Sequence, residues 1–300
     1  MDQLPPDYFV SSLQFTKHVY QDVYPAIDPT NPELSLADKV AIITGASRGI
    51  GAKGIIPAFA RAGVKGIVLV GTNIDALQAV EKEVKEVNST IKTLAVATNI
   101  ADAKSVDELF AKVKDTFGHA DILINNAGIN SGGGVIHEEK PEEWWQNFEV
   151  NTKGAFLLIQ NFIKSLPTLS TPGTIVNLVT AGAWGVYPQM SGYAVSKLAA
   201  LQLVANVAGA YPNITAISLH PGLVDTDMLL GFFRKFNLDS PALIGGLTVW
   251  LSGERAKFLS GRTIASNWSV EDLVERKAEI EAGGLLKIDL QGKFGRAQFE

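Results

Sequence analysis

Cysteine is absent from the 300 residues of this chain. Its absence excludes disulfide bonds, a thiol nucleophile and zinc held by thiolates. It is compatible with a reducing compartment, and we expect a cytoplasmic protein. The first ten residues contain an early Asp and a pair of prolines, where a secretory signal needs basic residues followed by an apolar run. The sequence therefore predicts no secretory leader.

The chain also lacks long apolar runs and blocks of basic residues. No stretch approaches the roughly 18 consecutive apolar residues of a membrane-spanning helix. Lys and Arg number 26 against 31 Asp and Glu, which gives a net charge of −5. This balance argues against a general binder of nucleic acids. We expect neither a nucleic acid nor a membrane as a partner, and no metal site.

The chain does have a hydrophobic content of 46% and 28 glycines, which is typical of a globular protein. A chain of this length can form one large α/β domain. Short apolar runs rich in β-branched residues predict strands at 40–44, 67–70, 94–97, 122–125, 175–179 and 214–219. Such continuous hydrophobicity is typical of a parallel sheet covered on both faces. We predict an α/β fold, a doubly wound sheet of about seven strands with helices on both faces.

Helical periods lie between these runs and beyond them. One helix is predicted from Ile74, and another over 106–117 with Gly118 as its stop signal. Pro57 lies inside a further helix and should kink it. A charged helix over 270–282, stopped by two glycines, precedes a polar tail.

The predicted domain organisation has three parts. Residues 38–268 form the α/β domain, and 269–300 form the C-terminal helix and tail. Residues 1–37 form an arm with three prolines between 24 and 32, which exclude a continuous helix or a central strand. The arm either wraps the domain or contacts another subunit, and a loose terminus is an equal alternative.

The first strand leads directly into a glycine-rich turn, Thr44-Gly-Ala-Ser-Arg-Gly-Ile-Gly51. Its three glycines permit a tight turn in which backbone N–H groups approach a pyrophosphate at a helix N-terminus. A glycine-rich turn alone is a weak signal, but its place between a first strand and a first helix favours a dinucleotide. The candidate phosphate-binding residues are Gly45, Ser47, Arg48, Gly49, Ile50 and Gly51.

The residue after the second strand favours NADP(H) over NAD(H). An acidic residue about 20 positions past the last glycine usually binds the ribose 2′-hydroxyl, but position 71 is glycine. No carboxylate would repel a 2′-phosphate there. Arg48 can supply a charged partner, with Thr72 and Asn73 as further donors; a solvated surface arginine is the bland alternative.

Tyr193 and Lys197 stand four residues apart, on one face of a predicted helix. A tyrosine with a pKa near ~10 is a poor acid–base catalyst at neutral pH, and lowering that pKa to ~7 requires about 4 kcal/mol. One unit charge at ~4 Å supplies roughly this energy at an effective dielectric constant of 20. A lysine assisted by a nicotinamide cation therefore suffices, although the spacing alone is common on solvated helices.

Taken together, these motifs resemble the short-chain dehydrogenase/reductase family over roughly residues 38–268. The match includes the glycine-rich turn, Asn125-Asn-Ala-Gly128, Asn151, the Tyr193/Lys197 pair and Pro221-Gly-Leu-Val-Asp-Thr226, in the family's order. The extended ends resemble those of fungal members.

The resemblance implies a role for each matching residue. Tyr193 is the general acid in ketone reduction and the base in alcohol oxidation. Lys197 lowers its pKa and binds the nicotinamide ribose, and Asn151 holds a water through its backbone. The remaining cofactor residues implied are Asn99, Ile100, Asn125, Ala127, Gly128, Pro221, Gly222, Val224 and Thr226. Asn99 stands where the family often has an aspartate beside the adenine.

Thr180 departs from the family pattern. The substrate-orienting residue, usually a serine, lies 13 positions before the tyrosine, which is Thr180 here. Threonine keeps a hydroxyl that can hydrogen-bond a carbonyl, but its β-branch restricts the rotamer. We expect Thr180 to take the serine's role.

The predicted substrate pocket is bulky and apolar. A mobile lid is expected over about 226–245, and the residues expected to contact substrate are Thr180, Trp184, Tyr187, Met228, Phe232 and Phe233. An aromatic stripe is more often core than ligand wall, but its position beside Tyr193 favours a hydrophobic ketone or alcohol as the substrate.

Two alternatives to an NADP(H)-dependent ketoreductase stay open at this stage. The same site can serve a non-reductive cyclase, epimerase or lyase, because fold and site are shared across chemistries. A cofactor-binding interaction protein without catalysis is the third reading. The resemblance also implies a homodimer or homotetramer formed through apolar helices near 142–165 and 194–208.

Overall fold

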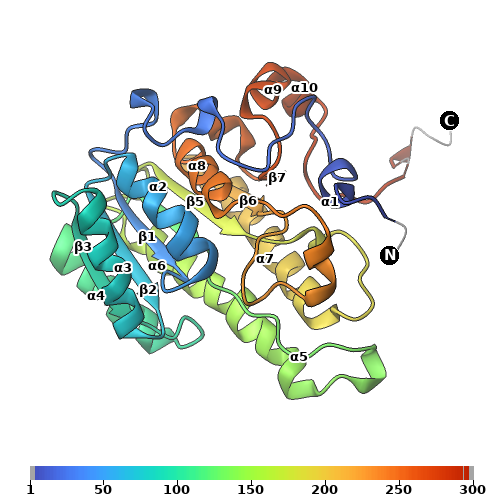
Figure 1. Cartoon of the computed structure of the whole chain (residues 1–300), viewed down its shortest axis with the longest axis horizontal. Helices are drawn as coiled ribbons and strands as arrows, with labels where there is room; N and C mark the ends of the chain where they lie inside the picture. Colours follow the sequence, from blue (N-terminus) through green and yellow to red (C-terminus); the bar gives the residue numbers. More distant parts are fainter. Residues whose placement is uncertain (1–3, 293, 297–300) are drawn as a thin grey trace.

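Seven parallel strands form one sheet at the centre of the molecule (Figure 1). The computed structural model describes residues 4–292 and 294–296; the outermost parts of the predicted arm and tail lie outside them. The strands are β1 (Val40–Thr44), β2 (Gly66–Gly71), β3 (Lys92–Ala97), β4 (Ile122–Asn125), β5 (Gly173–Leu178), β6 (Ile214–His220) and β7 (Thr263–Ala265). Their order is β3-β2-β1-β4-β5-β6-β7, with parallel neighbours throughout. The predicted doubly wound α/β fold is confirmed.

The strands form where the apolar runs predict them, since both faces of the sheet are covered. Every residue of β1 and of β6 is buried. The edge strand β3 is partly exposed, as expected of a strand with one neighbour. The three residues of β7 pair with the end of β6 and are too few to produce a hydrophobic period.

Helices cover both faces of the sheet. One apolar cluster joins the strands to α2 (Ile56–Arg61), α3 (Ile74–Val87) and α8 (Pro241–Leu251). A second cluster on the opposite face includes α4 (Ala103–Phe117), α6 (Ala155–Ser165) and α7 (Ser191–Ala210). The helix α5 (Pro141–Phe148) leads into α6 and extends beyond the body of the molecule (Figure 1). None of the helices among the described residues is sufficiently long and apolar to span a bilayer.

The start of α3 at Ile74 and the stop of α4 at Gly118 agree with the prediction, and side-chain caps fix the two N-termini. Asn73 caps α3, its side chain accepting a hydrogen bond from the Ala76 N–H at 3.0 Å. Asp102 caps α4 in the same way. Gly118 ends α4 in a left-handed conformation, with φ of 83°, which only glycine adopts easily.

Two wide helical turns of π geometry precede regular helices, at Gly51–Ile55 before α2 and at Glu149–Gly154 before α6. Pro57 lies in the first turn of α2, just after the first of these. A proline is tolerated in a first turn because its missing N–H has no helical partner there. The expected irregularity therefore takes the form of a wide turn on the N-terminal side of the proline.

The predicted helix over 270–282 is wrong in one respect, because it is divided into α9 (Val270–Glu275) and α10 (Lys277–Ala282). The backbone between them, at Arg276, has φ of −87° and ψ of 9°. The Arg276 side chain bonds both Glu279 and the carbonyl oxygen of Phe15 in the arm. We attribute the break to this distant contact.

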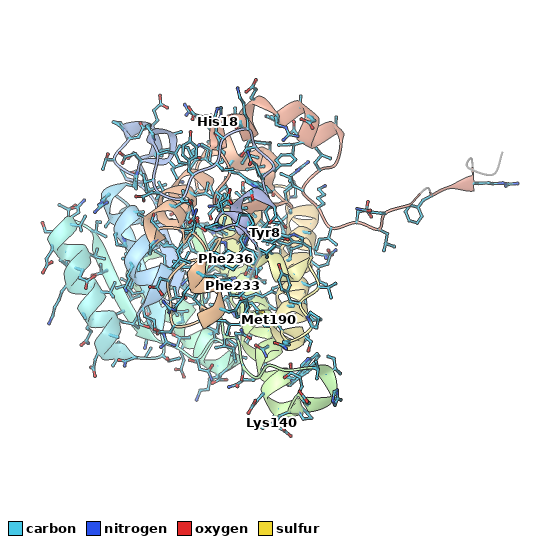
Figure 2. The ribbon with its side chains drawn as sticks, turned by 45° about the vertical axis from the view of Figure 1, so that its right-hand side comes forward. Tyr8, His18, Lys140, Met190, Phe233 and Phe236 are labelled. Atoms are coloured by element: carbon cyan, nitrogen blue, oxygen red, sulfur yellow. The ribbon has the colours of Figure 1, made fainter. Side chains whose placement is uncertain are left out.

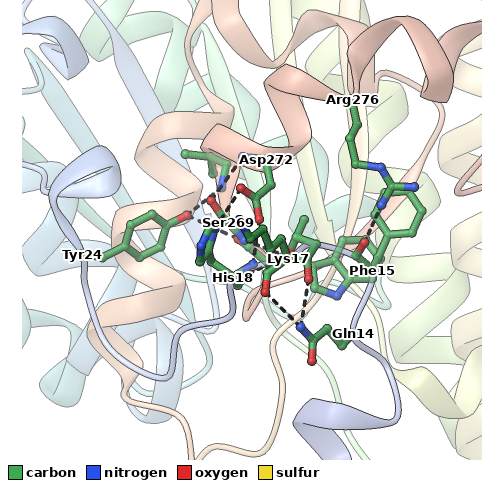
Figure 3. A network of polar contacts seen from close by, with 11 residues as sticks. Gln14, Phe15, Lys17, His18, Tyr24, Ser269, Asp272 and Arg276 are labelled. Carbon is green, nitrogen blue, oxygen red and sulfur yellow. Dashed lines mark hydrogen bonds and ion pairs between the residues drawn. The ribbon is translucent and has the colours of Figure 1, made fainter.

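The arm wraps the domain, as one of the alternatives proposed. It contains α1 (Tyr8–Ser11) and two 3₁₀ turns, Pro25–Ile27 and Pro32–Leu34. Tyr24 and Ile27 join the apolar cluster that contains α8. The polar contacts of the arm with α9 are drawn in Figure 3: the His18 N–H donates to Asp272 at 2.7 Å, and the Tyr24 hydroxyl accepts from the Val270 N–H at 2.8 Å. These contacts exclude a loose terminus for this part of the arm.

Candidate active site

A cleft lies at the carboxyl ends of the central strands, where the sheet order changes direction between β1 and β4. Open α/β sheets bind ligands at this point, because the loops after neighbouring strands diverge there. The cleft encloses about 260 Å³. It is lined by the glycine-rich turn after β1, the loops after β4, β5 and β6, the start of α7, and α1 of the arm.

The glycine-rich turn has the geometry that a dinucleotide requires. Gly45 and Gly49 have φ of 64° and 57°, in the left-handed region. A Cβ on Gly51 would lie 2.2 Å from the Gly45 carbonyl oxygen, so no larger residue fits the turn. Gly45, Arg48, Gly49 and Ile50 line the cleft. The residues present therefore fit a pyrophosphate held by backbone N–H groups at the start of the following helix.

Residues predicted at the 2′-phosphate lie at the outer end of this turn. Arg48 and Asp227 form an exposed ion pair, with Nη1 and Oδ2 3.2 Å apart. Exposed pairs of this kind contribute little free energy, so the arginine is available to a phosphate. Thr72 and Asn73 are exposed, but the Asn73 oxygen already caps α3, which leaves its amide N–H₂ as the donor. Ser47 lies close to the end of β2, because a Cβ on Gly71 would be 3.5 Å from its hydroxyl.

The other predicted adenosine-side residues are distributed between surface and core. Asn99 is exposed and its side chain accepts from the Ala101 N–H, while Ile100 is buried against the wide turn before α6. Asn125 is buried at the end of β4, and its side-chain atoms have no partner among the described residues. Ala127 and Gly128 line the cleft.

Lys197 and Asn151 are held at fixed positions below the cleft. The Lys197 Nζ donates to the Leu178 carbonyl oxygen at 2.8 Å. Asn151 accepts from the Ile129 N–H at 2.9 Å and donates to Ser196 at 3.0 Å. A Cβ on Gly128 would lie 3.1 Å from Nζ of the lysine and 3.0 Å from Oδ1 of the asparagine. The two side chains therefore meet at this glycine.

Asn151 also lies within the wide turn Glu149–Gly154. Because a π turn interrupts the regular helical hydrogen-bond pattern, it can release a backbone carbonyl from that pattern. The Asn151 amide donates both of its hydrogens, to Ser196 and to the Ile129 carbonyl oxygen at 2.9 Å. That its backbone holds a solvent molecule stays a prediction.

Tyr193 lies in the first turn of α7 and faces the cleft together with Thr180. The two side chains share a hydrogen bond. Thr180 is itself fixed as the cap of the 3₁₀ turn Ala181–Ala183, accepting from the Gly182 N–H at 3.2 Å. The predicted catalytic side chains therefore converge on one wall of the cleft.

The charge of Lys197 is not among the causes that set the pKa of Tyr193; the lowering expected from lysine and nicotinamide cation together stays a prediction. Desolvation in the cleft raises the pKa of Tyr193 to about 12, and the hydrogen bond with Thr180 offsets this only in part. Burial lowers the pKa of Lys197 to about 8. The charge argument considered only the distance between the two groups and omitted the cost of placing both in a low dielectric.

The segment after β6 closes one side of the cleft, where the resemblance places the nicotinamide. Pro221, Gly222, Val224 and Thr226 line the cleft. A Cβ on Gly222 would lie 2.0 Å from Oδ2 of Asp239, so the carboxylate requires glycine there.

Asp239 fixes the segment after β6 by accepting hydrogen bonds from the Leu223 N–H at 2.9 Å and from the Asn267 amide at 2.6 Å. Burial raises the pKa of this carboxyl to about 6, although its hydrogen bonds oppose the shift. A carboxyl in this position therefore joins the end of the cleft to the segment just before α9.

The predicted substrate residues divide into two groups. Tyr187, Met228 and Phe233 line the cleft. Trp184 and Phe232 are 42% and 45% exposed and are not among the residues that line it. The lid expected over about 226–245 extends no further than Ser240, because α8 begins at Pro241 and is buried from Leu243 onwards.

Several cleft residues were not singled out from the sequence. Asn126 donates to the carbonyl oxygens of Thr44 and Gly45 and so fixes the glycine-rich turn; its place inside Asn-Asn-Ala-Gly was the available signal. Phe9 and Val10 of the arm also line the cleft. No local pattern could have placed these two residues or Asp239 there, because their neighbours are distant in sequence.

Residues 39–235 match the family described as short chain dehydrogenase. The chain belongs to this family. The short chain dehydrogenase andI of Emericella variicolor is 34% identical over 285 residues, which cover 92% of this chain and 96% of that protein. The short chain dehydrogenase citE of Monascus ruber is 34% identical over 296 residues, covering 94% and 99%. Both matches extend beyond the residues that match the family.

A solved structure supports the same assignment. The L-sorbose reductase of Gluconobacter frateurii, complexed with NADPH and L-sorbose, is 28% identical, with a TM-score of 0.70, over 78% of this chain and 96% of that one. Short-chain dehydrogenases are oxidoreductases that bind a nicotinamide dinucleotide and act on small molecules.

Proposed function

We propose that this short-chain dehydrogenase uses NADP(H) to interconvert a hydrophobic ketone and the corresponding secondary alcohol. The observation that carries the proposal is the convergence of Tyr193, Thr180 and Lys197 on the cleft that also contains the glycine-rich turn. An acid–base side chain and a dinucleotide turn in one cleft suit proton transfer coupled to hydride transfer.

Tyr193 is the proton donor in the direction of reduction. Its pKa of about 12 keeps the phenol protonated at neutral pH, which is the form that gives a proton to a carbonyl oxygen. Thr180 hydrogen-bonds the same oxygen and so fixes the distance between substrate and phenol. When bound, the nicotinamide supplies the hydride. In the reverse direction the Tyr193 phenolate accepts the alcohol proton.

Lys197 and Asn151 restore the proton that Tyr193 gives away. The ammonium group lies at Gly128 together with the asparagine side chain, in the interior of the cleft. Its lowered pKa of about 8 makes it a readier proton donor than an exposed lysine. A solvent molecule on the Asn151 backbone would connect it to bulk water. Lys197 also holds the nicotinamide ribose in this proposal.

The preference for NADP(H) rests on Arg48 and on the missing carboxylate at Gly71. The guanidinium lies at the mouth of the turn, and its one ion pair among the described residues is with an exposed aspartate. A 2′-phosphate offers it two charge-assisted hydrogen bonds in place of one exposed ion pair. Thr72 and Asn73 supply neutral donors at the same place.

The hydrophobic substrate class rests on the apolar side of the cleft. The cleft that Tyr193 faces is also lined by Tyr187, Met228, Leu229 and Phe233. Such a wall favours ketones with an aromatic or polycyclic body, because burying apolar surface contributes about 25 cal/mol per Å².

Cofactor consumption tests the proposal. The purified protein is given NADPH and a panel of hydrophobic ketones, and the loss of NADPH absorbance is followed. We expect turnover with several ketones, and a rate at least about 100-fold lower for Tyr193→Phe because the general acid is lost. Replacing Arg48 by Ala should raise KM for NADPH about tenfold and leave KM for NADH nearly unchanged.

Two results would count against the proposal. Product formation without consumption of NADPH would indicate a non-reductive cyclase, epimerase or lyase. Full activity of the Tyr193→Phe variant would remove the tyrosine from the mechanism. The Val87→Ala variant serves as a control, since this exposed residue of α3 is not among those lining the cleft.

A further inference from the structure

The first helix of the chain lies against the lid rather than beside the sheet. In the arm, the ring of Phe9 meets those of Phe233 and Phe236 edge-on, with centroids 5.2 and 4.8 Å apart. The Asn237 N–H donates to the Pro6 carbonyl oxygen at 2.8 Å. The arm therefore contacts the lid through both side chain and backbone.

The same helix reaches the cleft itself. Phe9 and Val10 line it together with Tyr187, Met190 and Phe233. Figure 2 shows Tyr8, Phe236, Phe233 and Met190 following one another across this region. Burial raises the pKa of Tyr187, and the nearby phenol of Tyr8 adds to that rise, which places the arm close to the predicted substrate residue as well.

The position of α1 is fixed by the chain that follows it. The Leu13 carbonyl oxygen accepts from the Trp268 indole at 2.8 Å. The Arg276 guanidinium lies over the Phe15 ring, with its Cζ 3.8 Å from the centroid of that ring. His18 bonds Asp272 through its backbone N–H and through its ring. These contacts (Figure 3) leave α1 only a few residues of chain from an anchored segment.

We propose that Phe9 and Val10 form the outer wall of the substrate pocket, and that the arm thereby limits the size of ketone that the enzyme accepts. The inference rests on the proposed function, because it concerns the substrate side of the same cleft. The wall is apolar and its aromatic ring is braced by the lid. We expect a flat aromatic ketone of two rings to be accepted between this wall and Tyr187, and a bulkier body to meet Phe9.

The absence of cysteine in the natural chain allows a test that does not depend on turnover. A Phe9→Cys variant carries a single thiol, and the rate at which this thiol reacts with a chromogenic disulfide reagent is measured. We expect NADP with 2-acetylnaphthalene to slow this reaction at least about fivefold, since a bound ketone covers the wall. Leu290→Cys, at a site 78% exposed, should react at the same rate with and without the two compounds.

Kinetics with methyl ketones of one, two and three fused rings test the size limit. We expect Phe9→Ala to raise KM for the two-ring ketone about tenfold, with kcat and KM for NADPH within about twofold of the natural values. Phe9→Trp should lose the three-ring ketone and keep the one-ring ketone. Phe15→Ala removes an equal ring from the arm away from the cleft, and should lower Tm without changing the order of the ketones.

The outcomes separate this inference from the proposed function. If the ketone protects the thiol of the Phe9→Cys variant while the natural protein reduces no ketone, the wall is upheld and the ketoreductase is rejected. Ketone reduction by the natural protein, with an unprotected thiol in Phe9→Cys and an unchanged KM in Phe9→Ala, would overturn the wall alone. An equal rise of KM in Phe9→Ala and Phe15→Ala would assign the effect to arm docking and would also overturn it.

Discussion

The Thr180 hydroxyl takes part in two contacts. A serine at this position would make them with a hydroxyl that rotates more freely. The Thr180 oxygen accepts from the Gly182 N–H and shares a hydrogen bond with Tyr193. The β-branch restricts χ1, so the hydroxyl has little freedom to leave this arrangement. A substrate oxygen must therefore approach a hydroxyl that is already positioned.

Substitutions at Thr180 test this interpretation. Thr180→Ser should keep turnover within about threefold, because the hydroxyl is retained, while Thr180→Val should lose most of it, about 100-fold, because the donor is lost at nearly equal volume. The measurement is kcat/KM for a ketone at saturating NADPH. A fully active valine variant would reject the assignment of Thr180 as the orienting residue.

At the scale of single residues, the sequence predicted which side chains meet but not their acidity. The four-residue spacing of Tyr193 and Lys197 and the order of the motifs were sufficient to place both on the cleft. The pKa of Tyr193 could not be predicted, because burial raises it and burial depends on how segments distant in sequence surround the cleft. The roles of Trp184 and Phe232 were inferred from proximity in sequence, whereas their exposure depends on how two loops turn.

At the scale of secondary-structure elements, the position of the segment between β6 and α8 depends on one buried carboxyl group. Asp239 has a pKa of about 6 in the folded protein against 3.8 for the free side chain. Between these values the folded protein binds more protons than the unfolded chain. The contribution of Asp239 to stability is thus greatest below the lower value and is lost as the pH rises through the higher one.

Comparing the natural protein with an Asp239→Asn variant should reveal this dependence of stability on pH. As the pH rises from ~4 to ~7, the stability of the natural protein should fall relative to that of the variant by about 3 kcal/mol at most. Thermal unfolding of both proteins across this range provides the measurement. A difference in Tm that stays constant with pH would show that Asp239 does not titrate there.

Most elements were predictable because their signals are local. The strands β1 to β6, the cap at Asn73 and the stop at Gly118 each follow from a few adjacent residues. The break between α9 and α10 and the short strand β7 were not predictable. Arg276 is held by a carbonyl of the arm, and β7 owes its existence to the edge offered by β6.

For the whole molecule, three exposed apolar residues lie on the helices that the family resemblance assigned to subunit contacts. Phe156 of α6 and Val195 of α7 are each 44% exposed, and Trp145 of α5 is 55% exposed. Exposed rings on neighbouring helices are typical of surfaces that associate. A homodimer or homotetramer through this surface remains our proposal.

A charge on that surface should disrupt the assembly. We expect the natural protein to have a solution mass two or four times 32.1 kDa, and Phe156→Glu to reduce it, because a carboxylate would be buried without a partner. Light scattering after size-exclusion chromatography measures both masses. The exposed tail variant Leu290→Glu is the control, and an unchanged mass for Phe156→Glu would exclude α6 from the interface.

The docking of the arm on α9 has a consequence for the order in which the enzyme matures. The bond between His18 and Asp272 spans 254 positions of sequence, so a ribosome produces the arm long before its anchor emerges. The strands β1 to β5 and the glycine-rich turn are made well before that anchor, and loop closure over such a span is slow. A newly made chain would then bind its nucleotide before it can discriminate between substrates.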